Sequence, residues 1–272
     1  MALRLAIVFP GQGTAGGEVS DSEVREAVEA RVGEGEVPYQ LSVFASSVDT
    51  LHRLRESGVE PDVVAGHSLG EYAAAYATGS LSLEDAVRLV AERERLMSEA
   101  STEMPGGMMA IIGAGTHEIL EALNTTDGTV VAANFNSPRQ TVISGEEDAL
   151  EVVAGRVGGK KRKLDVAGAF HSPLMQGASI QMNELLAMVA LDDPKIPLIS
   201  GMDGAILAKA DDVRLALQDQ MLSAVRWVAV VERLAALGVE EIVEAGGGTL
   251  IRMLKDFRDV EIKGRAAKEV LV

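Results

Sequence analysis

A five-residue turn between a short apolar strand and a helix of small residues is the strongest constraint on how this chain folds. Asp62-Val63-Val64-Ala65 predicts a buried strand, and Gly66-His67-Ser68-Leu69-Gly70 follows it directly. The turn fits G-x-S-x-G, the pattern of a nucleophile elbow, where a strand enters a helix so sharply that small flanking residues are needed. Five residues also match by chance, but the strand before the turn and the alanine-rich helix through Tyr76 favour the elbow. The turn therefore predicts an α/β fold with Ser68 as candidate nucleophile.

The order of strands and helices on either side of the elbow predicts two sheets. Strands alternate with helices towards both ends of the chain, as expected for a parallel α/β sheet. Between Met108 and Val166 the order is instead strand, helix, strand, strand, helix, strand, the split pattern of a ferredoxin-like unit. We expect a large α/β domain from residues 1–103 and 174–272, with a small ferredoxin-like domain (βαββαβ) inserted over residues 104–173. The segment between residues 14 and 38 is polar and predicts at most one short helix.

The composition of the chain excludes several classes of site. There is no cysteine, so disulfides and thiolate metal sites are excluded and any nucleophile is an oxygen or a nitrogen. The formal net charge of −16 argues against general nucleic-acid binding, which needs a basic footprint. No run approaches the ~20 apolar residues of a membrane span. The apolar segment from Met1 to Phe9 enters a glycine turn at once, unlike a signal peptide, so we expect a cytoplasmic protein.

One dense basic run interrupts this acidic chain, at Lys160-Lys161-Arg162-Lys163. It leads into the last strand of the inserted unit, which is expected at Arg162–Val166. One interpretation is a solvated entry to that strand. The other is a docking patch for an acidic partner or a polyphosphate, because a local positive patch attracts such groups to a negative protein.

A serine hydroxyl needs a base to react at neutral pH, and the chain has only four histidines. His67 is adjacent to Ser68, and neighbouring side chains on such a turn diverge. His52 lies within a helix before the elbow, and His117 opens a helix of the inserted unit. His171 lies in the loop that returns from the inserted unit to the main sheet, where it would face the cleft between the domains. His171 is therefore the candidate base, and a structural loop histidine is the alternative.

Arg93 is a charged residue on the apolar face of a helix expected from the cap Ser82 to about Ala100. The apolar stripe of that helix consists of Ala86, Val90, Met97 and Ala100. A guanidinium on a buried face is costly unless it is paired. Arg93 therefore predicts either a structural ion pair with an internal carboxylate or bidentate binding of a substrate carboxylate.

Together these motifs resemble those of the malonyl-CoA:acyl-carrier-protein transacylases and the related acyltransferase domains of polyketide synthases. The matching segments span nearly the whole chain, in the order Phe9–Gly13, Gly66–Glu71, Arg93 with Met97, Asn134–Pro138, Ala169–Met175, Val225–Trp227 and Glu244–Gly248. The resemblance implies a hydrolase-like α/β domain that carries a ferredoxin-like insert, in agreement with the order of elements above.

The resemblance also implies roles for particular residues. Ser68 would take the acyl group, with His171 as its base. The backbone N–H groups of Gln12 and Leu69 would form the oxyanion hole, and Arg93 would hold a malonyl carboxylate. The substrates would be malonyl-CoA and the phosphopantetheine thiol of an acyl carrier protein, with no metal and no redox cofactor. The enzyme is expected to be monomeric.

Three further positions are expected to bind substrate or orient the base. In the family a main-chain carbonyl orients the histidine, from a position that matches Gln220. His67 and Asn136 lie in matched motifs, and we expect one of them, or ordered water, to hold Arg93 before substrate binds. The segment between Gln12 and Gln40 is shorter than in the family, Gly-Pro-Gly is replaced by Gly246-Gly247-Gly248, and a second glutamine is missing at Thr14-Ala15.

Other activities remain possible from the sequence. A serine esterase would share the elbow but normally adds an acid between serine and histidine, for which Asp127, Asp148 and Asp165 are the candidates within the insert. A carrier-protein docking module without activity is a further alternative. Within the transacylases, roles in fatty-acid synthesis, polyketide synthesis or a malonate decarboxylase are not separated.

Overall fold

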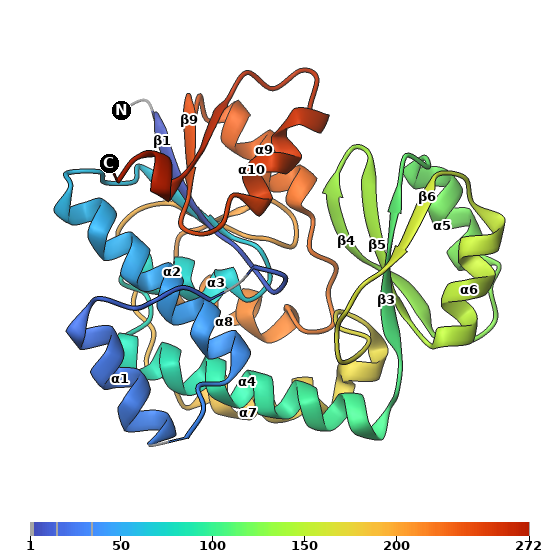
Figure 1. Cartoon of the computed structure of the whole chain (residues 1–272), viewed down its shortest axis with the longest axis horizontal. Coiled ribbons are helices and arrows are strands. Elements are labelled where there is room, and N and C mark those ends of the chain that lie inside the picture. Colours follow the sequence, from blue (N-terminus) through green and yellow to red (C-terminus); the bar gives the residue numbers. More distant parts are fainter. Residues whose placement is uncertain (1–2, 15, 34, 272) are drawn as a thin grey trace.

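Two β-sheets and the helices around them form this chain in a computed structural model, which describes residues 3–14, 16–33 and 35–271 (Figure 1). The strands within these ranges are β1 (Leu5–Phe9), β2 (Val63–Gly66), β3 (Gly107–Ile112), β4 (Val130–Ser137), β5 (Gln140–Gly145), β6 (Lys160–Lys163), β7 (Leu198–Ile199), β8 (Ile206–Leu207), β9 (Glu241–Glu244) and β10 (Lys263–Ala266). The helices there are α1 (Ser22–Val32), α2 (Tyr39–Glu56), α3 (Gly70–Ala77), α4 (Leu83–Glu103), α5 (Thr116–Asn124), α6 (Glu147–Arg156), α7 (Gln176–Ala187), α8 (Ala210–Asp219), α9 (Trp227–Ala236) and α10 (Thr249–Met253). The outer ends of the predicted large domain, residues 1 and 272, and Ala15 lie outside the described residues.

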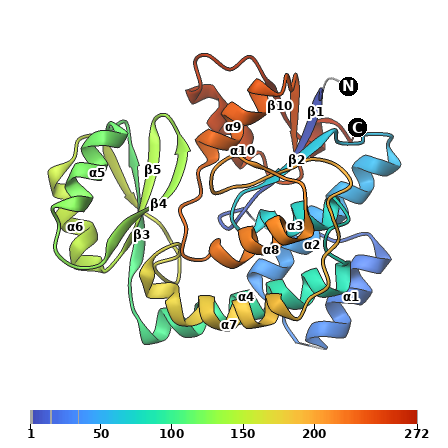
Figure 2. The ribbon, with the colours of Figure 1, turned by 180° about the vertical axis from the view of Figure 1, so that it is seen from behind.

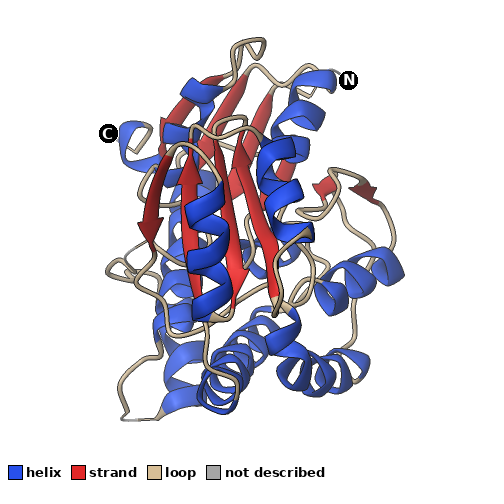
Figure 3. Ribbon diagram, turned by 90° about the vertical axis from the view of Figure 1, so that its right-hand side faces the viewer, coloured by secondary structure: helices blue, strands red, loops and turns tan. Residues whose placement is uncertain are grey.

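The larger sheet has the strand order β10-β9-β1-β2-β7-β8. All its neighbouring strands are parallel except β8, which runs antiparallel to β7 at one edge. Helices cover both faces of this sheet (Figure 3). The predicted α/β fold with a mainly parallel sheet is therefore confirmed.

Strand β1 is apolar at every position because both of its faces are buried. Ile7 and Phe9 belong to a core beneath α2 and α3, whereas Ala6 and Val8 belong to a second core beneath α9. Successive side chains of a strand point to opposite faces of its sheet. A strand that helices cover on both faces is therefore apolar at every position.

The smaller sheet has the order β4-β5-β3-β6, and every neighbouring pair in it is antiparallel. Helices α5 and α6 pack on one face through Met109, Ile111 and their neighbours. The opposite face, which carries Met108 and Ala110, belongs to the core of the larger part of the molecule. The predicted order of strand, helix, strand, strand, helix and strand is present between residues 107 and 163. Helix α4 leads into this sheet, and α7 runs back beside α4 (Figures 1 and 2).

A short backbone ladder joins the two parts of the molecule. The N–H of Phe135 in β4 donates to the carbonyl of Val225 at 2.8 Å, and the N–H of Val225 donates to the carbonyl of Ala133 at 2.8 Å. The Arg226 guanidinium lies over the Phe135 ring, 5.2 Å from its centroid. The matched motifs around Asn134 and Val225 thus form the seam between the two sheets.

Several predicted boundaries differ from the structure. The strand expected at Arg162–Val166 is β6 at Lys160–Lys163, because the chain leaves the sheet after Leu164 and turns towards the cleft. Helix α7 and strands β8 and β10 were not predicted. Strand β8 is only two residues long and β10 is a polar edge strand, so neither has the apolar signal of a buried strand. Within the described ranges, no helix is long and apolar enough to cross a membrane.

Candidate active site

The elbow holds Ser68 in a conformation that its glycine neighbours make possible. Strand β2 ends at Gly66 and α3 begins at Gly70. A Cβ atom on Gly66 would overlap the backbone of Gly70, and one on Gly70 would overlap the carbonyl of Phe9 in β1. Ser68 between them has φ of 52°, in the left-handed region that side chains rarely adopt. Such strain persists only where the surrounding structure fixes it, and it gathers at functional sites.

His171 lies within hydrogen-bonding distance of the Ser68 hydroxyl. The distance from Ser68 Oγ to His171 Nε2 is 2.8 Å. On its other side, His171 Nδ1 lies 3.0 Å from the carbonyl of Gln220 and 3.1 Å from that of Ser223. Two carbonyl acceptors require the proton on Nδ1, so Nε2 is free to accept the hydroxyl proton. The structure therefore brings the two predicted dyad members and the backbone of Gln220 together.

The electrostatic surroundings keep His171 neutral. Burial lowers its pKa to about 3, and the positive charge of Arg93 acts in the same direction. A neutral imidazole at every physiological pH is the form that accepts a proton. His171 has φ of 60°, and in the described part of the chain Ser68 and His171 are the non-glycine residues with positive φ.

Gln12 and Leu69 lie on the two turns that meet beside Ser68. Strands β1 and β2 are neighbours, and the N–H of His67 donates to the carbonyl of Phe9 at 2.9 Å. Leu69 is the residue before α3, where the helix dipole favours negative charge. Among the described residues, neither the Gln12 N–H nor the Leu69 N–H has a hydrogen-bond acceptor. Both donors are thus available to a developing oxyanion.

Arg93 is fully buried and reaches the nucleophile. Its Nη2 donates to Ser68 Oγ at 3.2 Å, and its Nη1 donates to Gln40 Oε1. The guanidinium lies 6.0 Å from the centroid of the Tyr72 ring. Within the described ranges, Arg93 forms no salt bridge and its Nε has no partner. The structural ion pair that the sequence left open is therefore not found there.

The expectation that His67 or Asn136 holds Arg93 was wrong. His67 Nε2 donates instead to Asn136 Oδ1 at 2.9 Å, and Asn136 Nδ2 donates to Gln140 Oε1 at 2.8 Å. The His67 ring also packs against Trp227, with ring centroids 5.7 Å apart. Burial lowers the pKa of His67, so this side chain is neutral as well. His67 and Asn136 form a separate pair beside Ser68, and Gln40 takes the position expected for them.

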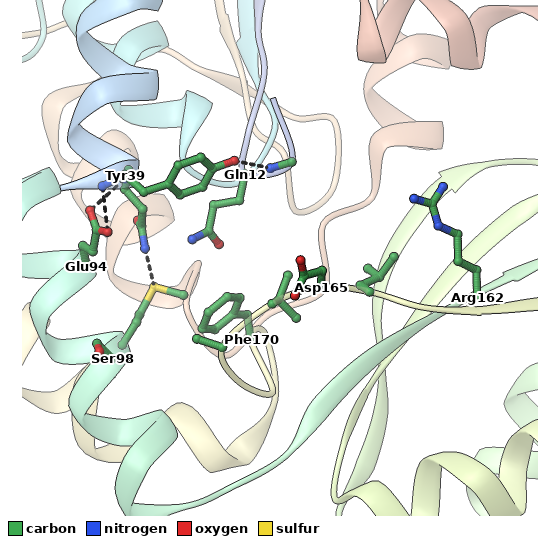
Figure 4. Close-up of a pocket in the computed structure, with 13 residues that line it drawn as sticks. Gln12, Tyr39, Glu94, Ser98, Arg162, Asp165 and Phe170 are labelled. Carbon is green, nitrogen blue, oxygen red and sulfur yellow. Dashed lines mark hydrogen bonds between the residues drawn. The ribbon is translucent and has the colours of Figure 1, made fainter. Parts of the chain in front are cut away.

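Two adjoining cavities lie between the sheets. The smaller, of about 130 Å³, is lined by Gln12, His67, Ser68, Asn136 and His171, among others. The larger, of about 570 Å³, shares Gln12 and Phe170 with it and extends to residues of both domains (Figure 4). A volume of this size accommodates a drug-sized ligand. The dyad thus lies at the inner end of a cleft between the sheets.

The basic run divides into two pairs on opposite faces of β6. Lys163 forms a salt bridge with Glu147 at 2.6 Å, and Lys161 Nζ donates to the carbonyl of Val157, both on the side of α6. Arg162 is in register with Ala110 of β3, whose side chain faces the large domain. Figure 4 shows Arg162 beside the larger cavity. Among the salt bridges of the described residues, none involves Lys160 or Arg162.

Two buried polar side chains of the site received no role from the sequence. Gln40 holds Arg93, and Glu71 contacts the side chain of Gln220. The sequence could have indicated a role for Glu71, because it is the one charged residue in a helix of glycine, alanine and tyrosine. Within the described residues, none of the three aspartates considered for an esterase forms a hydrogen bond with His171. The Nδ1 atom of His171 instead faces the carbonyls of Gln220 and Ser223. Asp165 lines the larger cavity, and Asp127 and Asp148 are exposed.

Comparison with known proteins identifies the class of this fold and site. A family model described as "Acyl transferase domain" matches residues 27–245. The malonyl CoA-acyl carrier protein transacylase of Bacillus subtilis (strain 168) is 33% identical over 279 residues, covering 91% of this chain and 88% of that protein. The chain thus contains an acyl transferase domain.

Solved structures agree with this assignment along the whole chain. The malonyl-CoA:ACP transacylase of Synechocystis sp. PCC 6803 matches with a TM-score of 0.87 and 28% identity, over 97% of each chain. A malonyl-transacylase solved in complex with a type II PKS acyl-carrier protein matches with a TM-score of 0.85 and 30% identity, over 97% of this chain and 95% of that one. The chain belongs to the malonyl-CoA:acyl-carrier-protein transacylase family.

Proposed function

We propose that this enzyme transfers a malonyl group from malonyl-CoA to the phosphopantetheine thiol of an acyl carrier protein, through an ester on Ser68. One observation carries the proposal: the guanidinium of Arg93 lies 3.2 Å from the same hydroxyl that His171 contacts at 2.8 Å. A nucleophile beside a buried cation suits an acyl group that ends in a carboxylate. The resemblance to malonyl transacylases points to the same acyl group.

In the first half-reaction His171 Nε2 takes the proton as Ser68 Oγ bonds to the thioester carbon. The carbonyl oxygen becomes an oxyanion, which the N–H groups of Gln12 and Leu69 stabilise. The C–S bond then breaks, and the CoA thiolate leaves with the proton from His171. The Gln220 carbonyl stabilises the imidazolium between these two transfers, in place of the carboxylate of a Ser-His-Asp triad.

The second half-reaction reverses these steps with a different thiol. The carrier thiol gives its proton to His171 and attacks the ester carbon, and the same two N–H groups hold the oxyanion. The C–O bond breaks, and Ser68 Oγ recovers the proton. Because the acyl group rests on Ser68 after CoA has left and before the carrier thiol reacts, the kinetics are ping-pong.

Arg93 and its neighbours would fix the acyl group in one pose. A malonyl carboxylate would take the guanidinium from Gln40 and form a bidentate pair in a site shielded from water. His67 and Asn136 would line the acyl group on the other side of Ser68, and Gln220 would hold the base. This pairing keeps the ester in place until the carrier thiol arrives.

The carrier protein would approach along the basic face of β6. The chain has a net charge of −16, so an acidic carrier needs a local positive patch to dock. Lys160 and Arg162 lie on the face of β6 directed to the cleft, which supports this assignment. The order β4-β5-β3-β6 supports classing the unit over residues 104–173 as ferredoxin-like. A monomeric state, a cytoplasmic location and the absence of a metal or redox cofactor stay predictions.

Intact-mass measurement on the two half-reactions tests the function. Mixed with malonyl-CoA alone, the enzyme should gain the mass of one malonyl group, and a holo acyl carrier protein added second should remove it and gain the same mass. Ser68→Ala should show no adduct, because Ser68 carries the hydroxyl that lies beside both His171 and Arg93 in the cleft. A stoichiometric adduct on Ser68→Ala, or loss of the wild-type adduct to water rather than to the carrier, would contradict the proposal.

A further inference from the structure

Glu71 is a buried carboxylate that the reaction does not use directly. It follows the nucleophile on α3 and is only 5% exposed. Its Oε1 accepts the N–H of Gly201 at 2.7 Å, and its Oε2 accepts the side-chain N–H of Gln220. A carboxylate is rarely buried without a partner that repays its desolvation. Here the side-chain partner of Glu71 is the neutral amide of Gln220. We therefore look for the role of the carboxylate in the contacts that Gln220 makes.

Gln220 connects the carboxylate to both members of the dyad. Its Nε2 donates to the main-chain carbonyl of Ser68 at 3.0 Å as well as to Glu71. Its own main-chain carbonyl lies 3.0 Å from His171 Nδ1. Gln220 is the residue that follows α8, so its position depends on where the end of that helix is held. The side chain of Gln220 therefore fixes the carbonyl that orients the base.

We propose that Glu71 is a positioning residue for the dyad: its carboxylate holds the Gln220 amide, and thereby the carbonyl that orients His171 towards Ser68. The acid of a Ser-His-Asp triad contacts its histidine directly. In this enzyme the acid acts through one intervening residue. The proposal deepens the malonyl-transfer function and rests on it for the identity of the reaction.

The geometry works only with an ionised Glu71. A carboxylate accepts from both the Gly201 N–H and the Gln220 N–H, whereas a carboxylic acid turns one oxygen into a donor that faces a donor. Burial raises the pKa of Glu71 to about 7, against the two hydrogen bonds and the charge of Arg93, which lower it. Asp203, on the turn after β7, raises it further. Burial lowers the pKa of His171 to about 3 and also lowers the pKa of His67, so Glu71 is the group of this site whose pKa lies nearest to 7.

The substitution Glu71→Gln isolates this role. The new amide keeps the size of the side chain but has one acceptor where the carboxylate has two. At pH 8 the rate of Ser68 acylation should fall by roughly 10- to 100-fold, less than the 10²–10⁴-fold reach of a general base. The KM for malonyl-CoA should hold, because Arg93 and the cavity are unchanged. Gln220→Leu, which keeps the main-chain carbonyl, should give a loss of similar size, and the double variant should lose little more.

The pH profile separates positioning from a structural role. Acylation by the wild type should fall below pH 7, by up to about tenfold per pH unit, as Glu71 takes a proton. Glu71→Gln should be slow and flat between pH 6 and pH 8. Glu244→Gln is the matched control: this other buried carboxylate accepts four N–H groups at the start of α10 and has no hydrogen bond to Gln220. It should lower Tm and retain the wild-type change with pH.

A substitution that only removes a structural contact lowers the stability of the protein. We expect Glu71→Gln not to lower the stability at pH 8. Unfolding lowers the pKa of Glu71 from about 7 to its ordinary value of 4.5, so wild-type stability falls as pH rises between these values. A neutral side chain avoids that loss. At pH 8 the Tm of Glu71→Gln should therefore equal or exceed that of the wild type while the rate falls.

A second acylating reagent keeps this test separate from the proposed function. A fluorophosphonate reacts with an activated serine whatever the natural acyl group, so its rate reports the dyad alone. If malonyl-CoA fails on the wild type while the fluorophosphonate rate depends on Glu71, the positioning role stands and the function is wrong. If both reagents acylate Glu71→Gln at the wild-type rate and with the wild-type pH profile, the positioning role is wrong and the function stands.

Discussion

The elbow and the basic edge strand β6 both border the cleft, and they are built in opposite ways. At the elbow, Gly66 and Gly70 touch neighbouring backbone, and the Ser68 side chain has two directed contacts in a buried site. On β6, Lys160 is exposed and no salt bridge among the described residues holds it or Arg162. In a rigid, buried site we expect one substitution to change the reaction rate strongly. On a solvated, charged strand we expect each substitution to change carrier binding only a little. The predictions below test that contrast.

After substitution of the nucleophile, substitution of the base should cause the largest loss of acylation rate. His171→Ala removes the acceptor for the Ser68 proton but leaves the oxyanion donors and Arg93 in place. Adduct formation from malonyl-CoA should slow by roughly 10²–10⁴-fold, the usual contribution of a general base. Rapid-quench intact-mass measurement gives the rate, and His67→Ala serves as the neighbouring-histidine control. Equal losses in the two variants would show that His171 has no special role.

Replacing Arg93 should change the preference of the enzyme and not only its rate. Charge-assisted hydrogen bonds are worth about 1.5–3 kcal/mol each, and Arg93→Ala removes two from the malonyl carboxylate. The kcat/KM for malonyl-CoA should fall by at least ~10²-fold, at about 1.4 kcal/mol per tenfold. Acetyl-CoA has no carboxylate to lose, so its transfer should hold steady or improve.

The ratio of the two rates is the quantity to measure for Arg93→Ala, since general destabilisation lowers both together. Gln40→Leu is a matched control, because it removes the resting partner of Arg93 and keeps the guanidinium. A parallel loss for malonyl-CoA and acetyl-CoA in Arg93→Ala would contradict carboxylate recognition.

Reversing charge on β6 should give the smallest effect, confined to the second half-reaction. The double change Lys160→Glu with Arg162→Glu should raise the KM for the carrier protein by about three- to tenfold, because exposed charges contribute little each. Lys161→Glu with Lys163→Glu alters the net charge equally on the opposite face and should leave that KM nearly unchanged. Equal effects on both half-reactions would assign the patch to CoA phosphates or to stability.

The sequence predicted the parts of the site that local motifs encode. The strand, glycines and helix around Ser68 fix the elbow within a few residues, and the small number of histidines singled out His171. Contacts between distant elements were beyond such reasoning. Arg93 meets Gln40 across 53 residues of chain, and Glu71 meets Gln220 across 149. Periodicity shows which face of α4 is buried but not which residue of α2 that face contacts. For this reason Gln40 was not predicted as the partner of Arg93.

The left-handed backbone at Ser68 limits which nucleophilic residues fit at this position. With φ of 52°, a second heavy atom on Cβ crowds the main chain, so threonine is a poor substitute even though it carries the same hydroxyl. Cysteine has no such branch and fits the turn. To change acyl specificity while keeping this nucleophile, we would therefore substitute Gln40, which contacts Arg93 and lies on the ordinary helical backbone of α2.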